Sequence, residues 1–368
     1  MGLMSISDKL AETYRGRTVL ITGHTGFKGG WLALWLESLG AHVIGYSLDP
    51  PTDPSFFQET ELSRRITDIR GDILDQTKLD RVINEYRPDF VFHLAAQPLV
   101  RASYQSPRET FNVNVMGTVN VLESIRVSQH PTVCVCITSD KCYENKEWDY
   151  AYRENDPIGG HDPYSASKGA AEIVIASYRK SFFEPDGSQP LCALSSARAG
   201  NIIGGGDWAD DRIVPDCVRS LVNGETMLLR NPTAVRPWQF VLDPLFGYLL
   251  LAQRMKEYPG EYSGAWNFGP YYSNNVDVQT LTGKIFREWG IGRWENMPQQ
   301  NNLHEACFLK LDIAKSMTRL GWKPVYSIDD AIHKTIEWYM ADFSRAEEMY
   351  NFSLDQIAMY MHDADNVE

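Results

Sequence analysis

The first half of the chain alternates short apolar runs with longer stretches in which apolar residues recur at helical spacing. The short runs predict strands at residues 18–23, 42–47, 90–95, 133–138 and 191–197. The longer stretches predict helices at residues 31–39, 78–86, 108–127 and 165–182. Strands and helices that alternate in this way are typical of a parallel sheet covered by helices on both faces. We therefore expect an α/β fold with a doubly wound parallel sheet.

The pattern changes after about residue 198. Three consecutive glycines, Gly204 to Gly206, and scattered prolines interrupt shorter elements, and the alternation of strand and helix is lost. We predict a Rossmann-type nucleotide-binding domain over residues 1–197. A smaller, interleaved α/β substrate lobe is predicted to make up most of residues 198–368, with some segments crossing back to the first domain. Ligands of such sheets bind at the carboxyl ends of the strands, where the motifs of the first half fall.

Composition and charge narrow the class of function. The chain has 368 residues, 43% of them hydrophobic and 23% charged, and its net charge is −13, which argues against general affinity for nucleic acid or anionic membranes. It shows no apolar run near the ~18 residues of a membrane span, and its N-terminus lacks the apolar core of a secretory signal. No metal-binding Cys or His spacing occurs, so we expect no metal and a cytosolic protein.

A glycine-rich loop lies between the first predicted strand and the first predicted helix. Its spacing is G-x-x-G-x-x-G, which lets the backbone turn tightly and approach a pyrophosphate while the helix N–H groups face the phosphates. A glycine-rich turn without a ligand is the alternative, but a strand before it and a helix after it favour a dinucleotide. The predicted contacts are Gly23, Thr25, Gly26, Phe27, Lys28 and Gly29.

Further cofactor contacts follow the next strands. Asp49 lies 20 residues after Gly29, where a carboxylate bonds the ribose 2′-hydroxyl and repels a 2′-phosphate, so NAD is favoured over NADP. Asp72 is placed to reach the adenine amino group. For both acids the alternative is a simple turn role. The remaining predicted contacts are Ile73, Leu94, Ala95, Ala96, Gln97 and Thr138, together with Tyr164 and Lys168 of the catalytic motif.

Tyr164 and Lys168 stand four residues apart on a predicted helix and therefore share one face. A nearby ammonium lowers the pKa of a phenol, so the phenolate can take a proton from a sugar hydroxyl. Tyr-x-x-x-Lys is common by chance. It gains weight here because it accompanies a dinucleotide loop and Ser139, which follows the strand at residues 133–138.

With these motifs the chain resembles the extended short-chain dehydrogenase/reductase family over nearly its whole length. Within it, the chain is most similar to the nucleotide-sugar 4,6-dehydratases, which place an Asp after the Ser or Thr of the catalytic strand. The dTDP-glucose type continues with Glu, whereas this chain has Ser139-Asp140-Lys141. That Lys, with the Gly-His-Thr-Gly-Phe-Lys-Gly loop, resembles the CDP-glucose branch.

The resemblance implies a reaction and a division of labour. Oxidation at C4 of the glucose acidifies the C5 proton, an acid protonates the departing C6 hydroxyl, and reduction at C6 completes a 4-keto-6-deoxy sugar. Ser139 would position the hydroxyl, and Asp140 would be the acid, which requires it to carry a proton at neutral pH. Lys141 is either the base at C5 or a cation that stabilises the enolate, and a solvated loop position is its alternative.

The resemblance also implies the substrate and the assembly. CDP-glucose is the expected substrate, and the predicted substrate contacts are Gln97, Asn201, Arg212, Arg230, Arg236 and Asn267. Surface ion pairs are the alternative role of the arginines. Two apolar helices, residues 111–125 and 165–182, match the family's dimer contact, a four-helix bundle, and the assembly is a dimer or a tetramer. Burial of these helices against the sheet is the alternative.

The predicted function is a CDP-D-glucose 4,6-dehydratase that uses NAD and serves dideoxyhexose and O-antigen synthesis. The nearest alternatives are a dTDP- or GDP-linked dehydratase and a nucleotide-sugar 4-epimerase. An epimerase needs Tyr164 and Lys168 but no acid and base at positions 140 and 141. A dinucleotide-sensing binding protein is a third alternative, although such a protein would usually lack the Tyr or the Lys.

Overall fold

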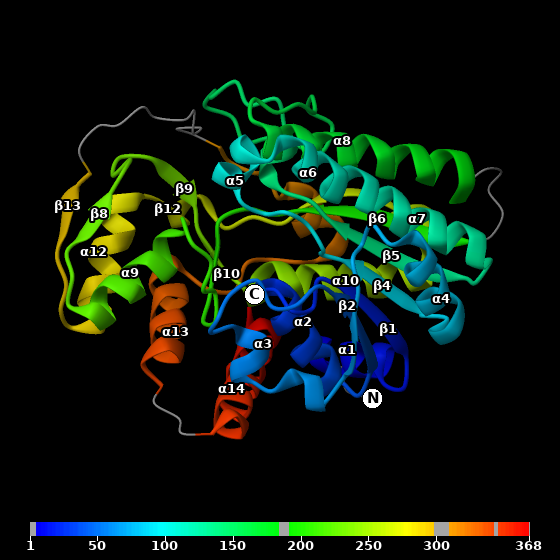
Figure 1. The fold of residues 1–368 in the computed structure, drawn as a ribbon, viewed down its shortest axis with the longest axis horizontal. Helices are drawn as coiled ribbons and strands as arrows, with labels where there is room; N and C mark the ends of the chain where they lie inside the picture. The colour runs from blue at the N-terminus through cyan, green and yellow to red at the C-terminus, as the bar shows by residue number, and fades with distance from the viewer. Residues whose placement is uncertain (1–4, 184–190, 298–308, 342–344, 368) are drawn as a thin grey trace.

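The computed structural model describes residues 5–183, 191–297, 309–341 and 345–367. A seven-stranded sheet lies at its centre, with strand order β11-β6-β5-β4-β1-β2-β3 and every pairing parallel (Figure 1). This confirms the predicted α/β class with a doubly wound sheet. The strands are β1 (Thr18–Thr22), β2 (His42–Ser47), β3 (Thr67–Arg70), β4 (Phe90–His93), β5 (Thr132–Ile137), β6 (Cys192–Arg198) and β11 (Gly264–Asn267).

Helices cover both faces because successive strand residues point to opposite sides. Val19 and Ile21 of β1 belong to a core that includes α2 and α10. Leu20 between them packs with α4, α7 and α8 on the other face (Figure 1). These helices are α2 (Phe27–Ser38), α4 (Gln76–Tyr86), α7 (Gly117–Ser128), α8 (Pro163–Tyr178) and α10 (Leu242–Glu257).

Much of the second half forms a smaller body beside the sheet, on the left in Figure 1. Three two-stranded sheets lie in this half: β7 (Ile202–Ile203) with β10 (Gln239–Phe240), β9 (Val235–Pro237) with β12 (Asn275–Asp277), and β8 (Met227–Leu229) with β13 (Trp294–Asn296). Its helices are α9 (Ile213–Asn223), α12 (Val278–Trp289) and α13 (Ile328–Met340). Strand β11 and helix α10 belong to the main sheet and its covering layer, although they come from the same half of the sequence.

The remaining elements connect and cover these layers. The other helices are α1 (Ile6–Tyr14), α3 (Phe56–Glu59), α5 (Val100–Gln105), α6 (Pro107–Phe111), α11 (Pro259–Tyr262) and α14 (Ala346–Asn366). Short helical segments of tighter or wider pitch are η1 (Leu62–Arg64), η2 (Asn112–Met116), η3 (Asp140–Cys142), η4 (Arg179–Phe183), η5 (Tyr272–Asn274) and η6 (Ser316–Leu320). None of the described helices is both long and apolar enough to cross a membrane.

The chain order in the sheet reverses between β1 and β4, and the crevice at such a point is where ligands bind in this architecture. The glycine-rich loop follows β1 directly. Residues Thr138 to Cys142 follow β5, two strands away in the sheet. The fold therefore brings the predicted cofactor loop and the predicted catalytic loop to the same edge.

Candidate active site

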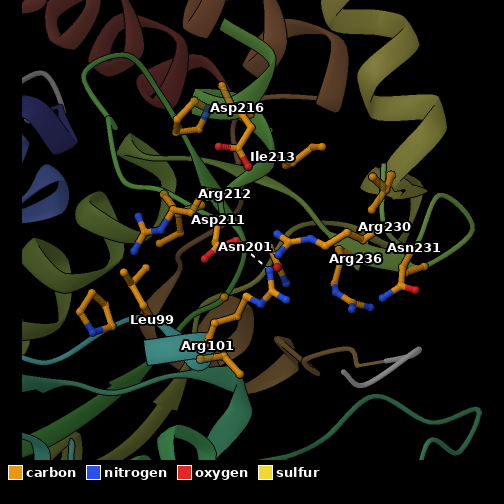
Figure 2. A pocket seen from close by; sticks show the side chains of 18 of the residues that line it. Leu99, Arg101, Asn201, Asp211, Arg212, Ile213, Asp216, Arg230, Asn231 and Arg236 are labelled. Atoms are coloured by element: carbon orange, nitrogen blue, oxygen red, sulfur yellow. Dashed lines mark hydrogen bonds and ion pairs between the residues drawn. The ribbon is translucent and has the colours of Figure 1, made fainter. Parts of the chain in front are cut away.

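A cavity of about 1060 Å³ opens between the carboxyl edge of the main sheet and the smaller body. Both halves of the sequence line it, and Figure 2 shows the part contributed mainly by the second half. Predicted site residues that line it are Phe27, Lys28, Thr138, Ser139, Asp140, Lys141, Tyr164, Asn201, Arg212, Arg230 and Arg236.

The loop after β5 holds the predicted acid in a defined place. The Ser139 hydroxyl accepts a hydrogen bond from the Lys141 backbone N–H at 3.2 Å, which starts the short helix η3. The same hydroxyl donates to Oδ1 of Asp140 at 2.9 Å. A residue with a short polar side chain is favoured at such a helix start for this reason. Ser139 therefore orders the catalytic loop as well as lying in the cavity.

Asp140 is fully buried, and its second carboxyl oxygen, Oδ2, has no hydrogen-bond partner. Gly200 lies directly against this carboxyl group: a Cβ at position 200 would stand 2.1 Å from Oδ2. Because an unsatisfied buried oxygen is costly, its occurrence in a cavity wall indicates a place where a substrate group would bond. Such an oxygen suits a proton donor to a sugar hydroxyl.

Helix α8 brings Tyr164 to the same cavity. Asp162 caps the helix by accepting a hydrogen bond from the Ser165 N–H at 2.9 Å, so Tyr164 lies in its first turn. Burial raises the pKa of Tyr164 to about 12, while a hydrogen bond with Ser139 and the charge of Arg212 act to lower it. The phenol and the Ser139 hydroxyl are thus neighbours, as a shared role on one sugar hydroxyl requires.

Lys168 lies one turn further along α8 and is buried. Its ammonium group donates to the backbone carbonyl of Ile137 at 3.4 Å, at the end of β5. Burial lowers the pKa of Lys168 to about 8, although Glu172 and two nearby cysteines act in the opposite direction. The predicted effect of Lys168 on the pKa of Tyr164 stays a prediction.

A network of buried polar side chains supports these catalytic residues. Glu172, a further turn along α8, accepts hydrogen bonds from Thr138 at 2.5 Å and Ser196 at 2.7 Å, and forms an ion pair with Arg198 at 2.7 Å. Burial would raise the pKa of Glu172, but Arg198 and the two hydroxyl groups hold it below its ordinary value. Arg198 also donates to the Tyr143 hydroxyl at 2.7 Å. Our sequence reasoning missed Glu172, although its spacing of four from Lys168 places it on the same helix face.

Lys28 turns from the glycine-rich loop into the catalytic part of the cavity. Burial, reinforced by the charges of Lys168 and Arg212, lowers the pKa of Lys28 to about 7, while Asp140 and Asp207 act in the opposite direction. The sequence placed Lys28 only among the cofactor contacts. The structure adds it to the group of charges around Asp140.

The glycine-rich loop has the shape that a pyrophosphate needs. Gly23 has a φ of +83°, and a Cβ there would lie 2.7 Å from the Ala95 backbone N. A Cβ on Gly29 would lie 2.1 Å from the Gly23 carbonyl oxygen, so loop and helix pack without side chains. Gly26 starts α2, and no side chain caps that helix. Uncapped N–H groups at a helix start attract phosphate, so this loop fits a dinucleotide.

The predicted adenosine contacts follow β2 and β3. The Asp49 carboxylate is 91% exposed and lies 3.6 Å from the guanidinium of Arg70. Asp72 is exposed and accepts a hydrogen bond from the Leu74 N–H at 2.9 Å, while Ile73 is buried. Thr25, by contrast, bonds to Ser47 and to the Leu48 carbonyl, so it ties the loop to β2.

The loop after β4 carries the other predicted cofactor contacts. Leu94, Ala95 and Ala96 are partly buried next to the glycine-rich loop. The Gln97 side chain donates to Thr110 and accepts from the Leu99 N–H, and Gln97 does not line the cavity. Its amide therefore shapes this loop, and the structure does not bring it to the cavity.

The structure places some of the predicted substrate residues at the cavity and others away from it. Asn201 lines the cavity, and its Nδ2 is buried without a hydrogen-bond partner. Arg212 lines it too, with Asp207 at 2.8 Å. Asn267 is fully buried elsewhere: its amide donates to the carbonyls of Tyr152 and Asp312. Because every polar atom of that amide is used internally, Asn267 has a structural role here.

These features define a class. A dinucleotide loop on a doubly wound sheet, with Ser139 and Tyr164 adjacent in one cavity and Lys168 one turn behind, is the arrangement of a short-chain dehydrogenase/reductase. The model of the GDP-mannose 4,6 dehydratase family matches residues 20–335. The chain therefore belongs to this family of nucleotide-sugar 4,6-dehydratases, as its resemblance predicted.

Individual relatives agree with this membership. The chain is 46% identical over 349 residues to the CDP-glucose 4,6-dehydratase of Salmonella typhimurium, an alignment that covers 95% of this chain and 97% of that protein. Among solved structures, the dTDP-glucose 4,6-dehydratase of Streptomyces venezuelae with bound NAD has a TM-score of 0.74 at 22% identity, covering 88% of this chain and 96% of that one. The UDP-glucose 4-epimerase of Thermotoga maritima with UDP-glucose has a TM-score of 0.73 at 20% identity, covering 88% and 98%. The two structures show the shared fold and do not separate dehydratase from epimerase.

Proposed function

We propose that the protein is an NAD-dependent CDP-D-glucose 4,6-dehydratase, which removes water from CDP-D-glucose to give CDP-4-dehydro-6-deoxy-D-glucose. The observation that carries this is that Ser139, Asp140 and Lys141 share one cavity with Tyr164. Oxidation alone needs the Ser and the Tyr, whereas elimination of water needs an acid and a base as well. The similarity to the Salmonella CDP-glucose 4,6-dehydratase supports the choice of nucleotide.

The glycine-rich loop fits NAD, as its steric limits and the open start of α2 support. We assign the pyrophosphate to Gly23, Gly26 and Gly29, and the 2′-hydroxyl of the adenosine ribose to the exposed carboxylate of Asp49. When bound, NAD would supply the two-electron oxidation at C4 and the matching reduction at C6. Other contacts to the cofactor are assigned to Asp72, Ile73, Leu94, Ala95, Ala96, Thr138 and Lys168.

Tyr164 would serve as the base that takes the proton from the C4 hydroxyl, and Ser139 would hold that hydroxyl by a hydrogen bond. Their mutual hydrogen bond supports this pairing. The raised pKa of Tyr164 means that loss of its proton needs nearby positive charge. Lys28, Lys168 and Arg212 are the cations around this part of the cavity.

Asp140 would donate a proton to the departing C6 hydroxyl, since its Oδ2 has no other partner. Lys141 would act on C5, where the proton is lost as the C6–O bond breaks. Two variants distinguish a base from an electrostatic role. We expect Lys141→Ala to retain C4 oxidation and lose dehydration, and Lys141→Arg to stay inactive if the Lys is the base. Dehydration by Lys141→Arg would instead assign the residue to stabilising the enolate, and normal turnover by Lys141→Ala would exclude both roles.

The diphosphate would be held by the cations of the smaller body. Arg212, Arg230 and Arg236 line the cavity together with the unpaired amide of Asn201. Guanidinium groups suit this task because they bond phosphate oxygens in pairs.

The nucleotide and the reaction can be tested together. The purified protein is incubated with NAD and, separately, with CDP-, dTDP- and UDP-glucose and GDP-mannose, and the base-labile chromophore of a 4-keto sugar is followed. Turnover of CDP-glucose far above the others supports the proposal. Turnover of dTDP-glucose or GDP-mannose alone would move the assignment to another branch, and epimer formation without loss of water would overturn the dehydratase.

We further propose a homodimer that pairs α6, η2, α7 and α8 of each subunit in a helical bundle. Large apolar side chains on these elements are exposed: Phe111 (39%), Met116 (47%) and Ile173 (63%). Apolar exposure of this kind is typical of an interface. We expect sedimentation to give a dimer and Ile173→Glu to give a monomer. A monomeric wild-type protein would contradict the bundle, and a further doubling of mass would indicate a tetramer.

We place the protein in the cytosol, in the synthesis of dideoxyhexoses for surface polysaccharide. All the described cysteines are buried and free, which suits a reducing compartment. A deletion strain that lacks dideoxyhexose in its O-antigen would support the pathway, whereas an unchanged sugar composition would contradict it.

A further inference from the structure

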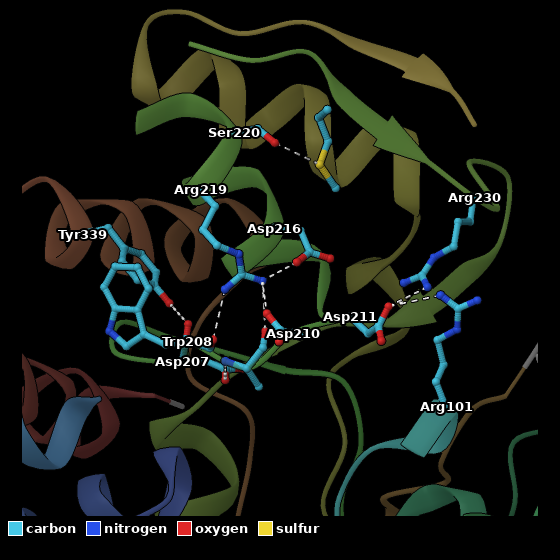
Figure 3. A network of polar contacts seen from close by, with 12 residues as sticks. Arg101, Asp207, Trp208, Asp210, Asp211, Asp216, Arg219, Ser220, Arg230 and Tyr339 are labelled. Atoms are coloured by element: carbon cyan, nitrogen blue, oxygen red, sulfur yellow. Dashed lines mark hydrogen bonds and ion pairs between the residues drawn. The ribbon is translucent and has the colours of Figure 1, made fainter. Parts of the chain in front are cut away.

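Two arginines from different parts of the chain share one carboxylate in the cavity wall. Asp211 accepts a hydrogen bond from Arg230 at 2.7 Å and another from Arg101 at 3.2 Å (Figure 3). Arg101 is carried by α5, on the loop that follows β4 of the main sheet, whereas Asp211 and Arg230 belong to the second half of the sequence. All three residues line the cavity. The contact thus connects the sheet to the smaller body across the site.

The local structure presents the Asp211 carboxylate to both cations. Its backbone is left-handed, with a φ of +60°, a conformation that Asp tolerates better than most residues. Partial burial would raise the pKa of Asp211, but the hydrogen bonds from Arg230 and Arg101 hold it below its ordinary value. The carboxylate carries one negative charge against two positive charges, so the group retains a net positive charge.

Other charged pairs lie close to the Asp211 contact. Arg212 pairs with Asp207, whose side chain is only 5% exposed. Arg219 pairs with Asp216 on its own helix and with the exposed Asp210 (Figure 3). The side chains of Arg101, Asp211 and Arg230 are 42%, 41% and 27% exposed. Ion pairs that water reaches contribute little to stability and exchange readily. An incoming anion can therefore displace the Asp211 carboxylate from the two arginines at little cost.

We propose that Arg101 and Arg230 together bind the diphosphate of the substrate, and that Asp211 holds the two guanidinium groups as an internal counter-ion until the diphosphate displaces it. This rests on the proposed nucleotide-sugar function. The diphosphate of CDP-glucose carries two negative charges and more acceptor oxygens than one carboxylate, so it satisfies both cations better. Asp211 competes for the same donors, which lowers the affinity of the free site but keeps the arginines in place.

The test compares the binding of inorganic pyrophosphate, CDP and cytidine by calorimetry. Asp211→Asn keeps the size and backbone preference of the residue but removes its charge, so we expect pyrophosphate and CDP to bind three- to tenfold more tightly and cytidine to bind unchanged. Arg101→Gln should weaken pyrophosphate and CDP on the order of tenfold, again without an effect on cytidine. In the variant that carries both Asp211→Asn and Arg101→Gln, the gain in affinity from Asp211→Asn should be smaller, because only Arg230 is then released.

Glu257→Gln is the matched control, because Glu257 pairs with Arg254 on an exposed part of α10 outside the cavity. It should leave all three affinities unchanged. Weaker or unchanged pyrophosphate binding by Asp211→Asn would overturn the competition, and unchanged binding by Arg101→Gln would overturn the role of Arg101. Pyrophosphate carries no base, so its binding tests this site independently of the nucleotide. If only another nucleotide sugar is turned over, the CDP assignment fails, but Asp211→Asn should still bind pyrophosphate more tightly. If CDP-glucose is turned over and the gain is absent, the inference fails alone.

Discussion

Replacing Gly200 by alanine should disable dehydration and leave the fold in place. The added Cβ would lie 2.1 Å from Oδ2 of Asp140 and 2.4 Å from Oδ1. Carbon and oxygen atoms in close contact stand about 3.3 Å apart. The carboxyl group therefore has to move by roughly 1 Å, and it is fully buried. A misplacement of about 1 Å costs on the order of 10²-fold in rate, whereas a methyl group added to a packed interior costs about 1–3 kcal/mol of stability.

The assay measures kcat with CDP-glucose and NAD, alongside unfolding in urea. Gly283→Ala is the matched control: Gly283 lies on α12, and beyond its chain neighbours and the adjacent backbone of that helix the described residues place no atom within 4 Å of the added Cβ, so kcat should not change. A Gly200→Ala enzyme that is folded and keeps the kcat of the wild type would contradict this prediction. That result would mean that the position of the Asp140 carboxyl is not critical to the reaction.

Two further predictions concern buried charges. Glu172→Gln should lower the free energy of unfolding by about 3–5 kcal/mol, because it leaves Arg198 buried without its counter-charge; a loss below about 1 kcal/mol in urea titrations, as expected for the exposed Glu257→Gln, would contradict this. Burial raises the pKa of Asp243 from its ordinary 3.8 to about 7. The carboxyl therefore stabilises the folded state below pH 3.8, and this contribution is lost as the pH rises to about 7. The wild type should therefore lose about 3 kcal/mol relative to Asp243→Asn between pH 4 and pH 7. Parallel pH profiles of unfolding would refute the second prediction.

Continuous apolar strands could be predicted from the sequence, and strands at the sheet edges could not. Strand β2 begins and ends where the pattern placed it, at residues 42–47. Strands β3 and β11 were missed, and they are the two edges of the sheet. The residues of β3 are partly exposed, so its apolar signal is weak. Strand β11 is largely buried, but its four residues, Gly-Ala-Trp-Asn, form no continuous apolar run.

The meeting of Asp140 with Tyr164 could be anticipated, because the carboxyl end of a strand and the start of the following helix lie at one edge of a parallel sheet. The direction in which a side chain points could not be anticipated. Gln97 and Asn267 lie in segments that resemble substrate contacts, yet both amides bond within the protein. The contact of Arg101 with Asp211 joins residues 110 positions apart and depends on how the smaller body packs on the sheet.

Mass spectrometry of the product formed with NAD in D2O tests whether this site eliminates water from CDP-glucose. We expect a nucleotide sugar that has lost one water and carries one deuterium at C5, because the C5 proton is removed and replaced from solvent. The Asp140→Asn variant should form far less of this product. A new product that has the mass of CDP-glucose but separates from it by chromatography, as an epimer would, would contradict the elimination of water.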